Sequence, residues 1–367
     1  MCLETKREGI HIEYGRGGRI MKRIAVFDSK KYDESSFAPY LKQYEFAFYK
    51  DKLSEHTAIL AKGFDAVICF VNDDLSKNVL DKLMEYGIHA VFLRCAGYNN
   101  VDLDAAYKNK IHIVRVPAYS PYAIAEHAFA LLLSLNRHIH KAYIRSRDFN
   151  FNLDGLTGFD LHDKTVGVIG TGKIGRVFID IAKGFGMHVI CSDPYPVKDS
   201  DYEYVSLEEL YTRSDIISLH CPLIESNKHM IGHDAIEKMK KGVVIINTSR
   251  GALIDSKALL EGLKEKKIGA VGLDVYEEES NLFYKDNSLK IINDDVLSLL
   301  IQLPNVIITS HQAYLTREAL DNIAKTTIEN MDEYFGGELI ANELCYHCEK
   351  SKDPQACYKA RKKRCFD

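Results

Sequence analysis

Short apolar runs alternate along this chain with stretches long enough to form a helix, and they do so in two series. The first series contains RIAVFD, YEFAFY, DAVICF, HAVFLR and IHIVRV, and the second contains TVGVIG, MHVICSD, DIISLHC, GVVIINTS, IGAVGLDVY and NVIITSH. Strands separated by helices are typical of parallel sheets with helices on both faces. The sequence therefore predicts an α/β protein with two doubly wound, Rossmann-like parallel sheets.

Size and composition exclude several classes of protein. With 367 residues, the chain exceeds the roughly 250–300 at which a single hydrophobic core stops growing, which predicts two domains. Its 46% hydrophobic and 27% charged residues exclude a disordered chain, and a net charge of −4 gives no basic field for nucleic acid. No apolar stretch reaches the ~20 residues of a membrane span, and the N-terminus has no apolar signal core. We therefore expect a cytoplasmic protein that binds neither a membrane nor nucleic acid.

Two further stretches predict helices outside the alternating pattern. Residues 120–147 predict one long helix between the two series, because Ser120 can cap it and Pro121 suits its first turn. Thr316 can cap a second, amphipathic helix, which a Gly-Gly pair ends. This last helix follows the second series, but we expect it to return to the first domain and complete it.

A glycine motif indicates a nucleotide-binding turn in the second series. Gly170, Gly172 and Gly175 form a G-x-G-x-x-G pattern that follows the run TVGVI and opens a helix at Lys173. The glycines permit a tight turn, a close approach of the backbone to a pyrophosphate and close packing of the helix on the sheet. Asp193 ends the next strand, 18 residues beyond the last glycine, where it would bind ribose hydroxyls and repel a 2′-phosphate. The motif predicts NAD as cofactor; the alternative is a glycine-rich turn with a capping aspartate.

Polar residues follow the other strands of the second series. Arg250 follows GVVIINTS, Asp274 and Glu279 follow IGAVGL, and His311 follows NVIITS. Because the carboxyl ends of parallel strands share one edge of a sheet, we expect these side chains and that of Asp193 to meet in one crevice. A guanidinium can bind a carboxylate and polarise the adjacent carbonyl, an imidazolium can donate a proton, and a neighbouring carboxylate can orient the imidazole. These residue types fit hydride transfer to a 2-oxo acid.

Taken singly, each of these residues also has a structural interpretation. Arg250 can be an ion-pair partner in a loop, Glu279 belongs to the charged run EEES, and His311 is one of 14 histidines. Spacing alone therefore leaves both interpretations open. No metal-binding spacing such as HExxH occurs in this region, so we expect no metal at the site and polarisation of the carbonyl by Arg250 and His311.

Longer stretches of the sequence carry a resemblance to a known family. They are RCAGYNNVDLDAA (94–106), VRVPAYSPYAIAEHAFALLLSLNRHIHKAY (114–143), LTGFDLHDKTVGVIGTGKIG (156–175), GFGM…SDPYP (184–196), ISLHCPL (217–223), NTSRGALIDS (247–256), LDVYEEES (273–280) and TSHQAYLT (309–316). Through these stretches, residues 21–344 resemble the D-isomer-specific 2-hydroxyacid dehydrogenases, and within them the fermentative D-lactate dehydrogenases.

The resemblance implies a role for each of several residues. Arg250 would be the catalytic arginine, Glu279 the acidic partner of the histidine, and His311 the proton donor. Besides the glycine turn, NAD would contact Ile174, Asp193, Cys221, Pro222, Asn227, Thr248 and Asp274. The substrate carboxylate would bind the amides of Ala96 and Gly97 and the hydroxyl of Tyr119, while Tyr98 and Tyr314 would line the pocket. A bulky Tyr314 favours a short substrate side chain, such as the methyl group of pyruvate.

The resemblance also implies a chain tracing and a reaction. We expect a flexible leader at 1–20, a discontinuous substrate domain formed by 21–118 and the closing helix at 315–344, an inserted NAD-binding domain at 119–314, and a tail at 345–367. The implied activity is that of an NAD-dependent D-lactate dehydrogenase, which reduces pyruvate, and the implied assembly is a homo-oligomer. Two alternatives stay open: a dehydrogenase for a longer 2-oxo acid, and a non-enzymatic, NADH-sensing co-repressor on the same scaffold.

The tail departs from that family. Its four cysteines, Cys345, Cys348, Cys357 and Cys365, have the spacing C-x2-C-x8-C-x7-C. This spacing is compatible with a small zinc knuckle, although the favoured interpretation is a tail with reduced thiols, and a redox-sensitive disulfide is a third. The other five cysteines are scattered, and they predict reduced thiols in a cytosolic protein.

Overall fold

The chain folds into two compact units. The computed structural model describes residues 21–279 and 282–345; unit 1 combines Met1–Pro117 with Ile323–Asp367, and unit 2 is Ala118–Asn322. Each unit contains its own sheet, and unit 2 is inserted into the sequence of unit 1. This confirms the predicted α/β class with one domain inserted into a discontinuous other. The predicted leader and the tail cysteines Cys348, Cys357 and Cys365 lie outside the described residues.

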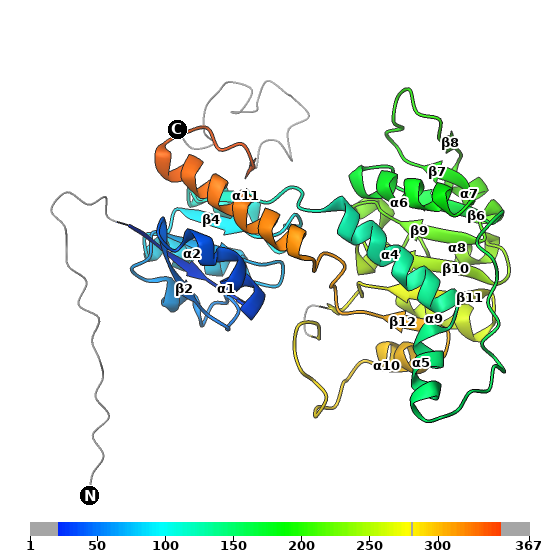
Figure 1. Ribbon diagram of the computed structural model, residues 1–367. Coiled ribbons are helices and arrows are strands. Elements are labelled where there is room, and N and C mark those ends of the chain that lie inside the picture. The colour runs from blue at the N-terminus through cyan, green and yellow to red at the C-terminus, as the bar shows by residue number, and fades with distance from the viewer. Residues whose placement is uncertain (1–20, 280–281, 346–367) are drawn as a thin grey trace, which may run out of the picture. The chain divides into compact units, whose positions relative to one another are not determined.

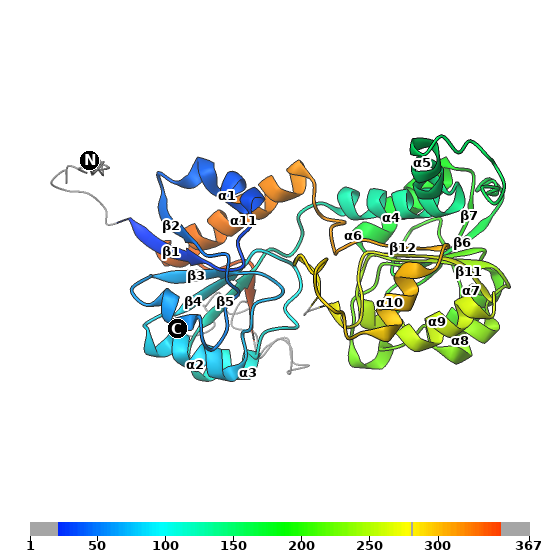
Figure 2. The same ribbon diagram turned by 90° about the horizontal axis from the view of Figure 1, so that it is seen from below.

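Unit 1 is built on a six-stranded sheet with the order β13-β5-β4-β3-β1-β2. Its elements are β1 (Lys22–Val26), α1 (Lys31–Phe37), the 3-10 helix η1 (Ala38–Tyr40), β2 (Tyr44–Phe48), the 3-10 helix η2 (Ala58–Ala61), β3 (Ala66–Cys69), α2 (Lys77–Glu85), β4 (Ala90–Leu93), α3 (Leu103–Lys108), β5 (His112–Arg115), α11 (Arg317–Gly336) and β13 (Glu343–Leu344). Figure 2 shows α1 and α11 on one face of this sheet and α2 and α3 on the other. Ile328 and Met331 of α11 pack with Ile24 and Phe92 of the sheet, so the closing helix returns to the first series of strands.

The sequence does not predict the edge strand β13. It pairs antiparallel with β5, with Glu343 opposite Val114 and Leu344 opposite Ile113. A two-residue strand is too short to leave an alternating pattern. Glu343 also binds the neighbouring strand through its side chain, because its carboxylate lies 2.5 Å from Nδ1 of the buried His112. The sheet of unit 1 is therefore parallel except at this edge.

Unit 2 is built on a seven-stranded parallel sheet with the order β12-β11-β10-β9-β6-β7-β8. Its elements are α4 (Pro121–Asn136), α5 (Ile139–Arg147), β6 (Thr165–Ile169), α6 (Lys173–Gly184), β7 (His188–Ser192), β8 (Glu203–Tyr204), α7 (Leu207–Arg213), β9 (Ile216–Leu219), the 3-10 helix η3 (Glu225–Asn227), α8 (His233–Lys238), β10 (Val243–Asn247), the 3-10 helix η4 (Gly251–Leu253), α9 (Ser256–Lys264), β11 (Ile268–Leu273), α10 (Asp295–Gln302) and β12 (Val306–Ile308). Figure 2 shows α4 and α6 on one face of the sheet and α8 and α9 on the other. Within the described part of the chain, no helix combines the length and the apolar character needed to cross a membrane.

The prediction of one long helix at 120–147 is wrong, because the structure has two helices there, α4 and α5. The N-terminus is as predicted: the hydroxyl of Ser120 accepts a hydrogen bond from the first turn of α4 at 3.1 Å. Just before the break, the side chain of Asn136 binds the main-chain carbonyl and amide of Phe159 at 2.7 and 2.9 Å. His138 then adopts a left-handed φ of 50°, which ends a regular helix. The helical spacing of apolar residues continues through both helices, so the spacing does not reveal the break.

A buried charged cluster lies beyond the carboxyl ends of β1, β3 and β4. Arg94 is 2% exposed, and its guanidinium lies 3.2 Å from Oδ1 of Asp33 and donates to two carbonyls after β1. Asp73 is 1% exposed and accepts hydrogen bonds from the amides of Leu53 and Phe70 at 2.6 and 2.5 Å. Burial raises the pKa of Asp73 to about 7, against the opposing effect of these amides and of Arg94.

The raised pKa of Asp73 predicts how the stability of the protein depends on pH. Because the folded-state pKa lies above the ordinary 3.8, the contribution of Asp73 to stability is fully present below pH 3.8 and is lost as the pH rises through about 7. Asp73→Asn removes this titration. We therefore expect the difference in Tm between the wild type and Asp73→Asn to shrink as the pH rises from about 5 to about 8. A constant or growing difference for Asp73→Asn would contradict this account.

Candidate active site

Glu279 and His311 form the centre of the candidate site. Glu279 lies in the loop after β11, and His311 follows the neighbouring strand β12 (Figure 1). Nδ1 of His311 lies 2.8 Å from Oε1 of Glu279, and the two side chains are only 17% and 19% exposed. The other carboxylate oxygen of Glu279 accepts a hydrogen bond from the amide of Tyr276 at 3.0 Å, which fixes the carboxylate. Nδ1 therefore carries a proton toward Glu279, and Nε2 is the nitrogen left to meet a substrate.

Asp274 organises the turn that carries His311. Its main-chain carbonyl accepts a hydrogen bond from the amide of His311 at 2.7 Å. Its fully buried carboxylate accepts hydrogen bonds from the amides of Gln312 and Ala313 at 2.9 and 2.8 Å. Within this turn His311 has a φ of 52°, in the left-handed region that residues other than glycine rarely adopt. The hydrogen bonds of Asp274 stabilise this unusual backbone conformation.

Two further side chains stabilise the charge of Asp274. Thr309 donates its hydroxyl to the carboxylate at 2.6 Å, and Nε2 of His127, on α4, lies 3.0 Å from that hydroxyl and 3.5 Å from the carboxylate. Burial alone would raise the pKa of Asp274, but the hydrogen bonds from His127, from Thr309 and from the two amides hold it below its ordinary value. The sequence predicts Asp274 as an NAD contact, and the structure gives it a second task, to hold the turn of His311.

Arg250 follows β10, the neighbour of β11 in the sheet. The side chain of Asn247 fixes its turn, because it donates to the carbonyl of Arg250 at 2.8 Å and accepts from the amide of Ser249 at 2.9 Å. The guanidinium of Arg250 donates to the carbonyl of Ser249 at 2.7 Å. The next residue, Gly251, lies so close to the loop after β11 that an added Cβ would be 2.1 Å from the carbonyl carbon of Tyr276. The main chain thus brings the turn of Arg250 against the loop that carries the catalytic glutamate candidate.

The glycine turn fits a dinucleotide. Gly170 has a φ of 97°, and a Cβ added there would be 2.7 Å from the main chain of His220; a Cβ at Gly175 would be 2.0 Å from the carbonyl oxygen of Gly170. Gly172, the N-cap of α6, would place a Cβ where nothing lies within 4 Å. The hydroxyl of the buried Thr248 has no hydrogen-bond partner among the described residues. Open space before a helix N-terminus is what a bound pyrophosphate requires, and Thr248, which follows β10 at the same edge of the sheet, offers an unpaired hydroxyl.

Three other predicted cofactor residues adjoin this turn. Lys173 and Ile174 form the start of α6, and Ile174 is partly buried against the core of unit 2. Asp193 follows β7, and its carboxylate accepts hydrogen bonds from the amides of Thr171 and Tyr195 at 2.6 and 2.7 Å. The carboxylate of Asp193 is thereby fixed next to the glycine turn.

The segment after β9 holds the remaining cofactor candidates. Cys221 and Pro222 follow this strand, and Asn227 fixes the segment by donating to the carbonyl of Pro222 at 2.8 Å. Burial raises the pKa of Cys221 to about 11, so this cysteine is a thiol rather than a thiolate near neutral pH. Burial lowers the pKa of the preceding His220 to about 3, which makes that imidazole neutral.

The predicted substrate residues are divided between the two units. Ala96, Gly97 and Tyr98 follow β4 in unit 1, whereas Tyr119 and Tyr314 belong to unit 2. In unit 1, Arg115 donates to the carbonyl of Ala96 at 2.8 Å, and its guanidinium lies 5.0 Å from the centre of the Tyr98 ring. In unit 2, the rings of Tyr119 and Tyr314 meet edge to face with 6.1 Å between their centres. Each group is therefore ordered by aromatic contacts within its own unit.

Free thiols occur among the described cysteines at Cys69, Cys191, Cys221 and Cys345. Burial raises the pKa of Cys191 to about 12. Cys345, the tail cysteine that the structure describes, is buried after β13. In residues 21–279 and 282–345, no group of three or more His, Cys, Asp and Glu side chains is arranged to hold a metal ion.

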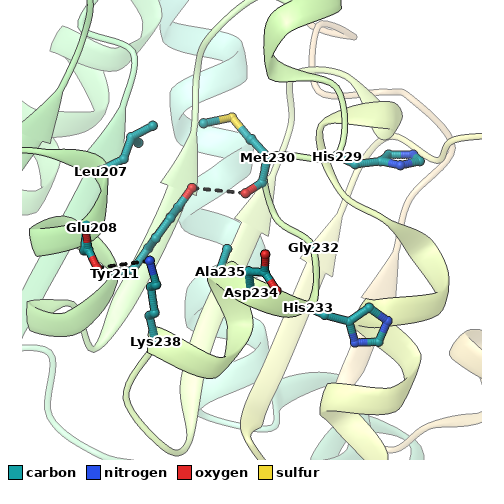
Figure 3. A pocket seen from close by; sticks show the side chains of 10 residues that line it. All are labelled: Leu207, Glu208, Tyr211, His229, Met230, Gly232, His233, Asp234, Ala235 and Lys238. Carbon is teal, nitrogen blue, oxygen red and sulfur yellow. Dashed lines mark hydrogen bonds and ion pairs between the residues drawn. The ribbon is translucent and has the colours of Figure 1, made fainter.

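A pocket of about 590 Å³ opens elsewhere on unit 2, beside α7 and α8 (Figure 3). Its polar groups contact one another: the hydroxyl of Tyr211 donates to the carbonyl of Met230 at 3.1 Å, and Lys238 lies 3.0 Å from the carboxylate of Glu208. None of the candidate catalytic or cofactor residues lines it. We therefore assign this pocket no part in the reaction.

Comparisons with known proteins agree with this geometry. Residues 129–313 match the model of the D-isomer specific 2-hydroxyacid dehydrogenase, NAD binding domain. The D-lactate dehydrogenase of Escherichia coli (strain K12) is 50% identical over 331 residues, which are 88% of this chain and 99% of that protein. The chain belongs to the D-isomer-specific 2-hydroxyacid dehydrogenase family.

Solved structures of this family extend over the same part of the chain. The pyruvate reductase of Chlamydomonas reinhardtii has a TM-score of 0.84 at 42% identity, covering 88% of this chain and 98% of its own. The D-lactate dehydrogenase with NAD+ from Lactobacillus jensenii has a TM-score of 0.74 at 31% identity, covering 88% of this chain and 99% of its own. These comparisons confirm the prediction of a 2-hydroxyacid oxidoreductase that uses NAD as its cofactor.

Sequence reasoning missed the residues that hold His311 in place. Thr309 lies in the family-like stretch 309–316, but its hydrogen bond to Asp274 joins residues that follow two different strands. His127 lies on α4, 182 residues before the hydroxyl that it contacts, and Tyr284 lies in the loop after β11. No spacing along the sequence signals such contacts.

Two alanine substitutions in the glycine turn of this dehydrogenase should have different effects, one on NADH affinity and the other on stability. Gly172→Ala adds a methyl group into open space, so we expect an unchanged Tm for the unliganded protein but at least a tenfold loss of NADH affinity (~1.4 kcal/mol), because the methyl group occupies the path of the pyrophosphate. Gly175→Ala should lower the free energy of unfolding by roughly 1–3 kcal/mol or more, and therefore the Tm, because the new Cβ overlaps a carbonyl oxygen. Thermal melts with and without NADH, and a fluorescence titration, measure both. Normal NADH affinity in Gly172→Ala would refute the placement of the cofactor.

Proposed function

We propose that this chain is an NAD-dependent D-lactate dehydrogenase that reduces pyruvate to D-lactate, with His311 as the proton donor. The observation that supports this most is the 2.8 Å contact between Nδ1 of His311 and the Glu279 carboxylate in a largely buried setting. A carboxylate at Nδ1 stabilises the imidazolium and orients it, so that Nε2 can donate its proton. The turn of Arg250 lies against the same loop, which supports a common site.

Each residue of the site then has a defined task. When bound, NADH supplies a hydride. Gly172, Asp193 and Thr248 would hold the cofactor, since Gly172 borders open space and the Thr248 hydroxyl has no partner among the described residues. Arg250 would bind the substrate carboxylate through two parallel hydrogen bonds and polarise the adjacent carbonyl. His311 would give its Nε2 proton to the carbonyl oxygen as the carbonyl carbon is reduced, and would end the reaction neutral.

A small substrate fits the aromatic residues of unit 2. Tyr314 is 6% exposed and packs edge to face on Tyr119, so two rings restrict the space on their side of the site. Restricted space favours a methyl group over a branched side chain, because each extra methylene needs room in the pocket. One methylene changes kcat/KM by about 10–200-fold. The relatives named above as D-lactate dehydrogenases and as a pyruvate reductase support the same choice. A dehydrogenase for a longer 2-oxo acid is the alternative.

We further propose how the chain is divided and where it acts. The substrate domain would be 21–118 with 315–344, and the NAD-binding domain 119–314. In this division, the amides of Ala96 and Gly97 and the hydroxyl of Tyr119 would receive the substrate carboxylate. The free thiols among the described cysteines support a cytoplasmic location.

We also propose that the chain forms a homo-oligomer. Large apolar side chains are exposed on α5 and just after it: Ile139, Tyr143, Ile144, Phe149, Phe151 and Leu153 are 56–84% exposed. A contiguous stretch of exposed apolar residues is typical of a surface that another protein covers. A second copy of the chain would cover it. A monomer in sedimentation velocity experiments at micromolar concentration would contradict this proposal.

Steady-state kinetics on a panel of 2-oxo acids test the function. We expect NADH oxidation with pyruvate at well above ~1 s⁻¹, and a kcat/KM for pyruvate that exceeds that for 2-oxoisocaproate. A higher kcat/KM for the branched acid would establish the alternative dehydrogenase. Tight NADH binding with turnover near or below ~1 s⁻¹ for every acid would instead establish a binding protein.

A further inference from the structure

A single loop contacts His311 at two separate points. At its start, the Glu279 carboxylate lies 2.8 Å from Nδ1 of the imidazole. Five residues further along, Tyr284 donates its hydroxyl to the main-chain carbonyl of His311 at 2.9 Å. One contact therefore fixes the ring and the other fixes the peptide that bears it.

The ring of Tyr284 is itself held in place. It is partly buried against the hydrophobic core of unit 2, next to Phe283, which is 8% exposed. The amide of Phe283 donates to the carbonyl of Glu279 at 2.9 Å, which ties the residue before Tyr284 to Glu279. The centres of the Tyr284 and His311 rings are 6.2 Å apart with 33° between their planes. A hydroxyl on a ring packed in this way has a fixed direction in which to donate.

The carbonyl that Tyr284 binds determines the direction of the imidazole. The carbonyl of His311 and the amide of Gln312 belong to one planar peptide unit. Tyr284 binds the oxygen of this unit, and Asp274 binds its N–H at 2.9 Å. Because the φ of His311 is 52°, the backbone at His311 lies in a strained conformation that its neighbours must maintain. A rotation of the peptide would swing the Cα–Cβ bond of His311 and displace Nε2.

We infer that Tyr284 is a positioning residue for the reaction: its hydroxyl holds the peptide of His311 so that Nε2 points at the substrate oxygen. The inference rests on the proposed function, because Tyr284 acts only through His311. Proton transfer requires alignment within a few tenths of an ångström, and a 1 Å displacement can lower a rate by about 100-fold. Loss of one oriented hydrogen bond should therefore affect the rate more than it affects the fold.

Tyr284→Phe tests this, since it keeps the ring and removes only the hydroxyl. We expect kcat for pyruvate to fall about tenfold per active site, with active sites counted by NADH fluorescence titration. The KM for NADH should be unchanged. The primary isotope effect with NADH deuterated at the transferred position should be at least as large as in the wild type, because the chemical step is slowed. The pH at which reduction declines should also be unchanged, because the contact of Nδ1 with Glu279 remains.

Tyr211→Phe is the matched control. Tyr211 is a buried tyrosine of unit 2 that likewise donates its hydroxyl to a main-chain carbonyl, that of Met230, at 3.1 Å (Figure 3). Its hydroxyl therefore binds neither Glu279 nor His311. We expect it to lower the Tm at least as much as Tyr284→Phe does and to leave the kcat per active site at the wild-type value.

The outcomes separate the inference from the function on which it rests. Wild-type kcat per active site in Tyr284→Phe, a loss matched by Tyr211→Phe, or a shifted pH profile would each overturn the positioning role. His311→Gln tests the function itself, which fails if that variant keeps wild-type kcat. An inactive His311→Gln beside a fully active Tyr284→Phe would refute the inference alone.

Discussion

The buried carboxylate of Asp274 is the interaction on which the candidate site depends. A charged group without solvent is costly, and here four donors compensate that cost: the amides of Gln312 and Ala313, the Thr309 hydroxyl and the imidazole of His127. Three of these donors, at Thr309, Gln312 and Ala313, lie after β12, so the charge is satisfied only when this turn is in place. The same turn gives His311 its left-handed backbone. The hydrogen bonds that stabilise the buried charge therefore also hold the proposed proton donor in place. They connect the segments after β11 and β12 with α4.

The sheet of unit 2 determines which residues can cooperate. β10, β11 and β12 are adjacent and parallel, so the segments after their carboxyl ends emerge at one edge although Arg250, Glu279 and His311 are far apart in the sequence. At that edge, the loop after β11 contacts the segment after β10 and the segment after β12. Its main chain packs against Gly251, and its side chains reach His311 at the ring and at the peptide. This loop is thus the element that joins substrate binding to proton transfer in the proposed mechanism.

The sequence predicts well what depends on periodicity and poorly what depends on side-chain contacts within loops. Alternating apolar runs predict every strand except β8 and β13, together with the class of the fold, and capping residues predict the helix starts after Ser120 and Thr316. Position after a parallel strand predicts that Glu279 and His311 meet. The same reasoning misses the break at His138, because apolar spacing continues across it, and β13, which is too short to show a period. It also misses the second role of Asp274, because hydrogen bonds from a side chain to the backbone of another loop leave no pattern in the sequence.

The claim that a carboxylate-bound imidazole delivers the proton is tested most directly by the pH dependence of kcat/KM in both directions, in the wild type and in Glu279→Gln. The account predicts that the reduction of pyruvate declines with rising pH as His311 loses its proton, and that the oxidation of D-lactate rises over the same interval. In Glu279→Gln kcat/KM should fall at least about tenfold in both directions, because a neutral amide no longer holds the Nδ1 proton and orients the ring. Rates of reduction that stay flat between about pH 6 and about pH 9 in the wild type, or wild-type kcat/KM in the variant, would contradict it.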